Sequence, residues 1–232
     1  MIRSLDDISI GLDALAAMDE RLLPVIERAG ALPLRAGDPG LPGLAATLMG
    51  QQVSRASATA ITSRLAGMVD LNDAASILAL DDTAFRTAGL SRAKERTLLA
   101  IASAVITGTL DFDRIAAADS RAAIAELTAV PGIGPWTAEC YLLFCLGRED
   151  IFPAGDLALQ VAVAHAFGME ERPGDRPLRA MAELWSPHRS VAARLFWAYY
   201  AAVTRRDATP AALQQDAKLS LIHISEPTRQ AE

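Results

Sequence analysis

The sequence predicts an all-α protein, and three observations support this prediction. Apolar residues recur every three to four positions along the chain, which is the period of an α-helix, and no segment alternates as a strand does. Residues that favour helix starts stand before the periodic segments, and Gly and Pro separate them. With 232 residues, of which 51% are hydrophobic, the chain can bury a substantial core as one domain or as two closely packed lobes.

The helical period defines the predicted elements in order along the chain. The apolar residues that carry it through the first half are Leu12, Leu15, Ala16, Leu22, Leu23, Ile26, Ile61, Leu65, Met68, Leu98, Leu99, Ile101, Ala102 and Val105. The predicted N-caps are Asp19, Ser54, Ser91, Asp119 or Ser120, Asp156 and Thr209, the last of which precedes Pro210. Between helices, residues 36–43 (AGDPGLPG) are predicted to form a linker and residues 172–175 (RPGD) a loop.

The charge balance excludes a protein that coats nucleic acid indiscriminately. The formal net charge is −6, whereas sequence-independent affinity for nucleic acid comes mostly from Lys and Arg that neutralise phosphates. Any contact with nucleic acid must therefore be local. Nearly all cations are arginines, and four of them lie on the C-terminal helical pattern: Arg189, Arg194, Arg205 and Arg206. Most of these four are predicted to be solvated, and some to face a phosphate backbone.

The two cysteines, Cys140 and Cys145, are too few for a disulfide framework or a four-thiolate iron–sulfur cluster. Both are predicted to be buried apolar fillers of a helix. The sequence offers no side-chain set for zinc or another transition metal. Its apolar runs are short and interrupted by charge, and its start is acidic, so we expect neither a signal peptide nor a membrane span and predict a cytoplasmic protein.

The most informative stretch is residues 130–138 (VPGIGPWTA), which joins two apolar helical patterns. Pro131 cannot continue the first helix, and Gly132 and Gly134 are predicted to take positive φ so that the chain reverses tightly. Pro135 suits the first position of the next helix, whose unpaired N–H groups favour an anion such as a phosphate. An ordinary helix–helix turn is the alternative interpretation of this segment.

Four segments in this order resemble the helix-hairpin-helix family of base-excision DNA glycosylases, in its 3-methyladenine DNA glycosylase II branch. They are residues 49–54 (MGQQVS), residues 89–94 (GLSRAK), the hairpin followed by Trp136 and Asp156, and residues 185–190 (WSPHRS). The resemblance runs from Leu44 to about Val203. The interval of 20 residues (156 − 136) between the tryptophan and the aspartate matches that of the family.

This resemblance implies a two-lobed helical fold. Residues 38–149 would form one lobe that carries the hairpin at 130–135, and residues 1–37 would pack with residues 150–218 as the other. DNA and an extruded base would occupy the cleft between them. The chain is similar to a compact form of the family without its additional N-terminal domain. Residues 219–232 show no helical period and resemble read-through of a sequencing adaptor; a disordered natural tail is the alternative.

By resemblance, Asp156 is the catalytic residue. An ionised carboxylate there would stabilise the positive charge that develops at C1′ of the deoxyribose and would orient the attacking water. A helix N-cap is the structural alternative, and the two roles are compatible. Bifunctional relatives use a lysine on the hairpin helix, whereas the only lysines here are Lys94 and Lys218, so a monofunctional enzyme is predicted.

The resemblance also implies a base pocket. Trp136 would stack on an extruded base, with a cation–π contribution when alkylation makes the purine cationic; packing of the two lobes is the alternative role. His188 stands where relatives place an aromatic ring, and Cys140 stands where some have a larger residue. These two departures leave the base preference open.

Gln52 lies at the family's wedge position, where a side chain fills the gap left in the duplex, and Gln51 is its neighbour; amides that cap adjacent helices are the alternative. Ser91 and Lys94 are predicted to contact phosphate, or else to be a plain N-cap and a solvated lysine. The predicted DNA contacts of the hairpin are Gly132, Gly134 and Thr137.

No cofactor is expected to be required, although the family's hairpins often hold Na⁺ or K⁺ through backbone carbonyls, which would here be those of Thr128, Val130 and Ile133. The expected partner is double-stranded DNA with alkylated bases, no membrane contact is expected, and the protein is expected to be a monomer. Two other functions stay open: a glycosylase for deaminated or oxidised bases, and a non-catalytic DNA-binding protein. The second would be expected to lack the aspartate and the pocket aromatic.

Overall fold

The computed structural model describes residues 1–204, and over that range the chain is helical without a strand, as predicted. Two short 3₁₀ segments, η1 (Glu20–Leu22) and η2 (Glu183–Trp185), accompany the α-helices. The helices are α1 (Leu5–Met18), α2 (Leu23–Ala29), α3 (Gly40–Met49), α4 (Arg55–Ala66), α5 (Ala74–Leu78), α6 (Asp82–Ala88), α7 (Arg92–Ile106), α8 (Phe112–Ala117), α9 (Ser120–Thr128), α10 (Pro135–Phe144), α11 (Leu157–Ala166), α12 (Asp175–Ala182) and α13 (Arg189–Thr204).

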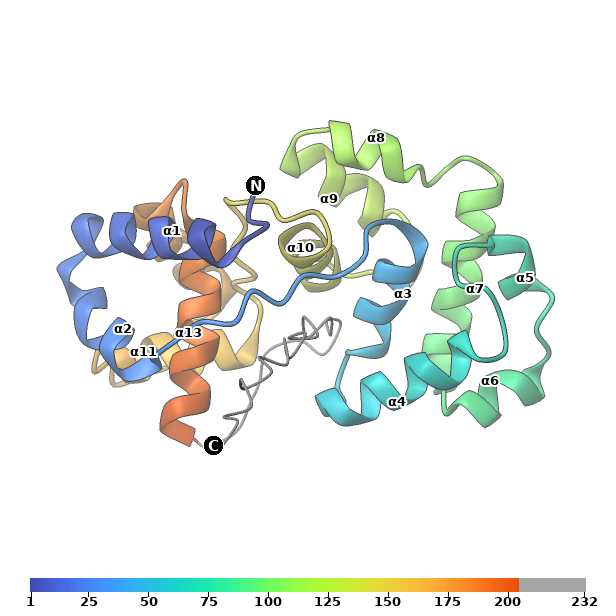
Figure 1. The fold of residues 1–232 in the computed structure, drawn as a ribbon, viewed down its shortest axis with the longest axis horizontal. Helices are drawn as coiled ribbons and strands as arrows, with labels where there is room; N and C mark the ends of the chain where they lie inside the picture. The colour runs from blue at the N-terminus through green and yellow to red at the C-terminus, as the bar shows by residue number, and fades with distance from the viewer. Residues whose placement is uncertain (205–232) are drawn as a thin grey trace, which may run out of the picture.

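The helices form two groups with α10 between them (Figure 1). In one group α13 packs against α1, α2 and α11; in the other, α3 packs on α4 and α7, and α5 packs on α7. The chain crosses between the groups at residues 30–39 and again at residues 145–156. The second crossing leads directly into Asp156, the N-cap of α11.

Helix α10 lies in the core of the molecule. Its residues from Thr137 to Phe144 are all buried, including Glu139, and it packs against α3 and α9. Cys140 and Cys145 are buried free thiols, as the sequence predicted. A helix enclosed on all sides keeps a fixed position, and α10 is therefore a rigid support for the side chains of its first turn, Trp136 and Thr137.

The expected linker over residues 36–43 is only partly correct, since α3 begins at Gly40. Proline is tolerated in a first helical turn, whose N–H groups have no partner within the helix, so Pro42 did not signal a loop. Gly43 is required here for close packing, because a Cβ at this position would lie 1.8 Å from the carbonyl oxygen of Asp38.

The local signals for helix starts and loops are confirmed over the described residues. Side chains at each of the predicted positions accept a backbone N–H at the start of η1, α4, α7, α9 and α11: Asp19, Ser54, Ser91, Asp119 and Asp156. The predicted loop at residues 172–175 ends where α12 begins, at Asp175. Thr209 lies outside the described residues, as do Lys218 and residues 219–232.

Of the four arginines near the C-terminus that were predicted to be mostly solvated, Arg194 is buried and Arg189 is partly buried. Arg194 is 4% exposed, donates to the carbonyl of Leu34 and lies 4.7 Å from the ring centroid of Phe144, so the prediction of a solvated charge is wrong for it. Arg189 forms a two-pronged bond to Asp150 at 2.6 and 2.8 Å. Arg205 and Arg206 lie outside the described residues. Within residues 1–204, no helix has both the length and the apolar character needed to cross a membrane.

Candidate active site and DNA-contacting turns

The hairpin between α9 and α10 combines one left-handed glycine with one open glycine. Gly132 has φ +91°, and a Cβ there would lie 2.0 Å from Thr97 Oγ1 on α7, so only glycine fits. The prediction of positive φ is wrong for Gly134, which is the extended N-cap of α10 with φ −91°. Among residues 1–204, a Cβ at Gly134 would meet nothing within 4 Å, so no described side chain packs on the backbone at the start of α10, and Pro135 follows at N1 as predicted.

Four N–H groups surround the carboxylate of Asp156, which is 9% exposed. Oδ1 accepts the backbone N–H groups of Ala158 and Leu159, at 2.9 and 3.0 Å, and the indole N–H of Trp197 at 3.2 Å. Oδ2 accepts the indole N–H of Trp136 at 2.8 Å. The capping interpretation is thus correct, and the cap fixes Oδ1 while Oδ2 is directed towards the hairpin helix.

Trp136 and Asp156, the two residues on which the predicted chemistry depends, are in direct contact. The indole is half-buried and uses its N–H edge for the carboxylate. This edge contact leaves the π faces of the ring free of that hydrogen bond, and a face is what a stacked base needs.

Sequence reasoning missed Trp197, the second indole that donates to Asp156. Trp197 lies on α13, is fully buried and stacks on Phe144 with a centroid distance of 5.5 Å. The only signal for its role was chemical: a tryptophan within an apolar helix still needs an acceptor for its N–H.

The two remaining pocket candidates differ in how they are placed. Cys140, one turn after Trp136, is fully buried; desolvation raises the pKa of its thiol well above 9.0, and the nearby Asp156 carboxylate adds to this shift. His188 is half-buried just before α13, and its main chain contacts Trp185, Val191 and Ala192. Among residues 1–204, its ring makes no hydrogen bond to Trp136 or Asp156, so its place in the pocket stays a prediction.

The turn after α3 carries the two glutamines. Gln52 is exposed and has φ +56°, a left-handed conformation that is uncommon for a residue other than glycine. Gln51 is half-buried instead, and its Nε2 donates to Thr137 Oγ1 at 2.6 Å. Gln52 is therefore displayed at the surface, while Gln51 joins its turn to the first turn of α10.

Ser91 and Lys94 have separate structural roles at the start of α7. Ser91 Oγ accepts the N–H of Lys94 at 3.3 Å and caps the helix. The solvated-lysine interpretation is wrong, because Lys94 is 9% exposed and its Nζ donates to the carbonyl of Met49 at 2.7 Å. Desolvation lowers the pKa of this ammonium below its ordinary value of 10.5.

The first turn of α10 thus brings the predicted elements together. Gly134 opens it to a ligand, Trp136 contacts Asp156, and Thr137 contacts the turn that displays Gln52. In the hairpin before it, the carbonyl of Val130 accepts the N–H of Ile133 at 3.1 Å. This arrangement combines an uncovered helix start, an aromatic ring and a carboxylate, which are the kinds of group that the predicted base excision needs.

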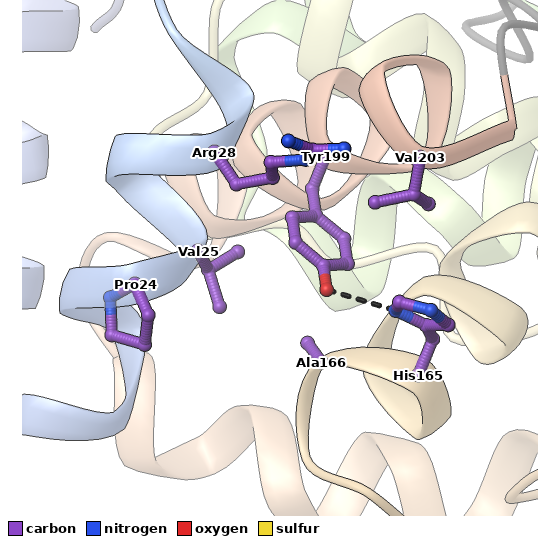
Figure 2. Close-up of a pocket in the computed structure, with 7 residues that line it drawn as sticks. All are labelled: Pro24, Val25, Arg28, His165, Ala166, Tyr199 and Val203. Carbon is purple, nitrogen blue, oxygen red and sulfur yellow. Dashed lines mark hydrogen bonds between the residues drawn. The ribbon is translucent and has the colours of Figure 1, made fainter.

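A separate hollow of about 410 Å³ lies between α2, α11 and α13. Figure 2 shows the Tyr199 hydroxyl directed at the ring of His165, and the O to Nδ1 distance is 2.8 Å. His165 lies nine residues after Asp156 on α11, which places it about 14 Å further along the helix axis. The hollow therefore does not belong to the site around Asp156.

The fold and this site define a helical protein of base excision, with a hairpin and an acid beside an aromatic ring. Residues 45–187 match the family described as "HhH-GPD superfamily base excision DNA repair protein". The chain belongs to this superfamily.

Solved structures of similar fold include 3-methyladenine glycosylases. Schizosaccharomyces pombe 3-methyladenine DNA glycosylase (Mag1), in complex with abasic DNA, superposes with a TM-score of 0.73 at 25% identity, covering 82% of this chain and 95% of that one. The DNA-3-methyladenine glycosidase of Bacillus halodurans gives 0.71 at 32% identity, covering 84% of this chain and 90% of that one.

The curated relatives with similar sequences are also named as DNA-3-methyladenine glycosylases. DNA-3-methyladenine glycosylase 2 of Escherichia coli (strain K12) is 28% identical over an alignment 222 residues long. The alignment covers 82% of this chain and 75% of that protein. The match to YfjP of Bacillus subtilis (strain 168) is 30% identical and covers 52% of this chain, but it spans only 42% of that protein.

Proposed function

We propose that this protein is a monofunctional DNA glycosylase that flips alkylated purines, of the 3-methyladenine and 7-methylguanine type, out of double-stranded DNA and hydrolyses their N-glycosidic bond. The observation that carries the proposal is the 2.8 Å bond between Trp136 Nε1 and Asp156 Oδ2. It ties a stacking surface for a base to a carboxylate, so that a base held on the ring has its sugar beside the acid.

Asp156 acts on the sugar. As the base departs, C1′ acquires oxocarbenium-like positive charge, which a carboxylate held in a water-poor site stabilises. The Oδ1 contacts to Ala158, Leu159 and Trp197 hold the group before DNA arrives, so little rearrangement is needed at the moment of bond cleavage. The same carboxylate orients the water that adds to C1′.

Trp136 acts on the base. Stacking on the indole favours any extruded base, and a purine made cationic by alkylation gains a further cation–π attraction of about 0.5–2 kcal/mol. Such a base is already activated as a leaving group. The proposed preference for alkylated purines follows from these two effects together.

The hairpin and the glutamine turn act on the duplex. The open backbone at Gly134 and the N-terminal end of α10 bind a phosphate, and Gln52 fills the space that the extruded nucleotide leaves. The backbone carbonyls of Thr128, Val130 and Ile133 are the proposed holders of a Na⁺ or K⁺ ion that bridges to the phosphate. The enzyme is proposed to act as a monomer.

The absence of strand cleavage is part of the proposal. The one lysine among the described residues, Lys94, is on α7 and donates to the Met49 carbonyl rather than lying on the hairpin helix. The hairpin helix α10 has no lysine that could form a Schiff base with the sugar, and the proposed product is therefore an intact abasic strand.

The test is incubation of duplex oligonucleotides that contain 7-methylguanine, hypoxanthine, 8-oxoguanine or uracil, followed by hot alkali. Release of 7-methylguanine with strand breaks that require alkali is expected. Excision of 8-oxoguanine or uracil instead would support a glycosylase for oxidised or deaminated bases. Strand breaks without alkali would contradict the monofunctional mechanism, and binding without release of any base would support a non-catalytic protein.

A further inference from the structure

Helix α7 contacts both turns that the proposed function places against DNA. Lys94 donates from α7 to the carbonyl of Met49, the last residue of α3, at 2.7 Å. Thr97, three residues further on, packs against the backbone of Gly132 in the hairpin. Residues three apart share one face of a helix, so a single face of α7 touches both turns. Figure 1 shows α7 beside α3, and these two helices are in contact.

A third contact connects the turn at residues 50–54 to the first turn of α10, which follows the hairpin. Gln51 Nε2 donates to Thr137 Oγ1 at 2.6 Å, and Thr137 is 2% exposed on α10. The turn at residues 50–54 is thus held by Lys94 through Met49, the residue just before it, and by Thr137 through Gln51. Gln52 follows directly after these two contacts, exposed and in a left-handed conformation that the surroundings must stabilise.

The chemistry of the Lys94 contact fits a bracing role. The last carbonyls of a helix lack partners within the helix and carry partial negative charge, which a cation complements. Burying an ammonium is costly unless it is hydrogen-bonded, and at 9% exposure the Nζ of Lys94 has this bond to a backbone carbonyl. Its position is therefore suited to hold the chain at Met49 rather than to display charge to phosphates.

We infer that Lys94 is a positioning residue, which holds the turn at residues 50–54 so that Gln52 enters the duplex, while α7 sets the spacing between this turn and the hairpin. The inference rests on the proposed function, because it concerns the extrusion step of that reaction. It assigns to Lys94 an effect on how a paired base leaves the helix, and none on the bond cleavage at Asp156.

The test compares two duplexes under single-turnover conditions with saturating enzyme. In one, 7-methylguanine is paired with cytosine; in the other it stands opposite a tetrahydrofuran abasic analogue, where there is no pairing to break. Lys94→Met keeps the length of the side chain and removes the donor. We expect it to slow release from the paired duplex by about tenfold, the size expected for one charge-assisted hydrogen bond, and to slow release from the unpaired duplex much less.

Two further variants make the comparison specific. Gln52→Ala should show the same dependence on pairing, and the double variant Lys94→Met/Gln52→Ala should lose no more than the slower single variant, because both act on one step. Thr137→Val, which removes the acceptor of Gln51, opens the same brace at its other contact and should resemble Lys94→Met. Arg96→Met removes an exposed cation from the same helix and serves as the matched control.

Equal slowing of both duplexes by Lys94→Met, or losses that multiply in the double variant, would overturn the inference. Amide hydrogen exchange of the free protein gives an independent readout: Lys94→Met should speed exchange at residues 50–53, and Arg96→Met should not. Unchanged exchange in that segment would equally overturn it. If the wild-type protein releases no base, the proposed function fails, whereas the exchange measurement still decides whether Lys94 holds the turn.

Discussion

The indole N–H of Trp136 donates to Asp156 Oδ2 at 2.8 Å, and this bond joins the first turn of α10 to the N-cap of α11. It links the hairpin helix, which the proposed function places against phosphate, to the helix that carries the acid. A displacement of either helix would therefore move the stacking ring and the carboxylate apart. The contact between the ring and the carboxylate therefore depends on how these two helix starts meet.

Replacing Asp156 by Asn should abolish most of the activity and leave the fold intact. Asn is about as good an N-cap as Asp, but it is uncharged, and its NH₂ group would face the N–H of Trp136. We expect single-turnover release of 7-methylguanine to fall by about 10²–10³-fold. Asp119→Asn is the matched control, because Asp119 caps α9 through Ala122 away from the site. An unaffected Asp156→Asn variant would exclude this residue from the mechanism.

Substitution of Trp136 should change selectivity in addition to lowering general activity. Trp136→Ala removes the aromatic face, and with it a cation–π contribution of about 0.5–2 kcal/mol that only a cationic base receives. The ratio of release rates for 7-methylguanine over neutral hypoxanthine should fall in this variant and be partly kept in Trp136→Phe. A ratio that is the same in Trp136→Ala and the wild type would show that the ring does not select the base.

Trp197→Phe should lower the turnover rate without affecting DNA affinity. The change removes the N–H that holds Asp156 Oδ1 at 3.2 Å and keeps a ring to pack on Phe144. Loss of one such bond is worth about 1 kcal/mol, so kcat should fall roughly fivefold at unchanged KM. Trp185→Phe removes a comparable buried bond, to Asp19, and should leave kcat unchanged. A rise of KM in Trp197→Phe would contradict a role limited to positioning.

The hairpin glycine can be tested through stability. Gly132→Ala places a Cβ 2.0 Å from Thr97 Oγ1 at φ +91°, whereas the Cβ of Gly108→Ala, at φ +71°, meets no described residue within 4 Å. The second variant has only the left-handed backbone cost of about 1–2 kcal/mol, and the first should lose about 1–3 kcal/mol more through overpacking. Urea denaturation measures both. Equal losses would mean that α7 does not pack on the hairpin as described.

The ion pair between buried Glu139 and partly exposed Arg179 predicts a pH dependence of stability. Desolvation raises the pKa of Glu139 above its ordinary 4.5, although the bond to Arg179 at 2.7 Å opposes this. For Arg179, the bonds to Glu139 and Asp175 outweigh desolvation and raise the pKa. The Glu139 side chain is 5% exposed and that of Arg179 is 43% exposed, so desolvation of the carboxylate dominates the titration of the pair.

With a raised pKa in the folded state, Glu139 binds its proton more tightly in the native protein than in the unfolded chain. Its contribution to stability is therefore fully present below pH 4.5 and is lost as the pH rises through the folded pKa. The unfolding free energy of the wild type, relative to Glu139→Gln, should fall between pH 4 and pH 7. An increase over this range would mean that the bond to Arg179 outweighs desolvation.

The sequence predicted the features that depend on neighbouring residues, and the resemblance to the family predicted that two distant site residues lie together. The caps at Asp19, Ser54 and Asp156 depend on a few neighbouring residues, and the pairing of Trp136 with Asp156 follows from their spacing in the family. The predicted positive φ is wrong for Gly134, because the sequence does not distinguish a glycine that turns the chain from one that only leaves space beside the backbone.

Contacts between distant segments were not predictable. Lys94 and Met49 are 45 residues apart, and Gln51 and Thr137 are 86 apart, so nothing in the local pattern indicated that these side chains meet. The burial of Arg194 depends on segment 30–39, which is far away in the sequence. The local pattern around Arg194 therefore indicated a solvated side chain. The role of Trp197 was not predictable for the same reason, since its acceptor, Asp156, lies 41 residues away at the start of another helix.

The enclosure of Cys140 and Cys145 in the core has a consequence for an enzyme proposed to repair alkylation. Agents that methylate purines also attack thiolates, which are the reactive form of cysteine. Burial raises the pKa of both thiols, that of Cys145 to about 12, and so keeps them protonated at neutral pH. Neither sulfur offers these agents an accessible nucleophile, and the folded protein should resist the electrophiles whose DNA damage it removes.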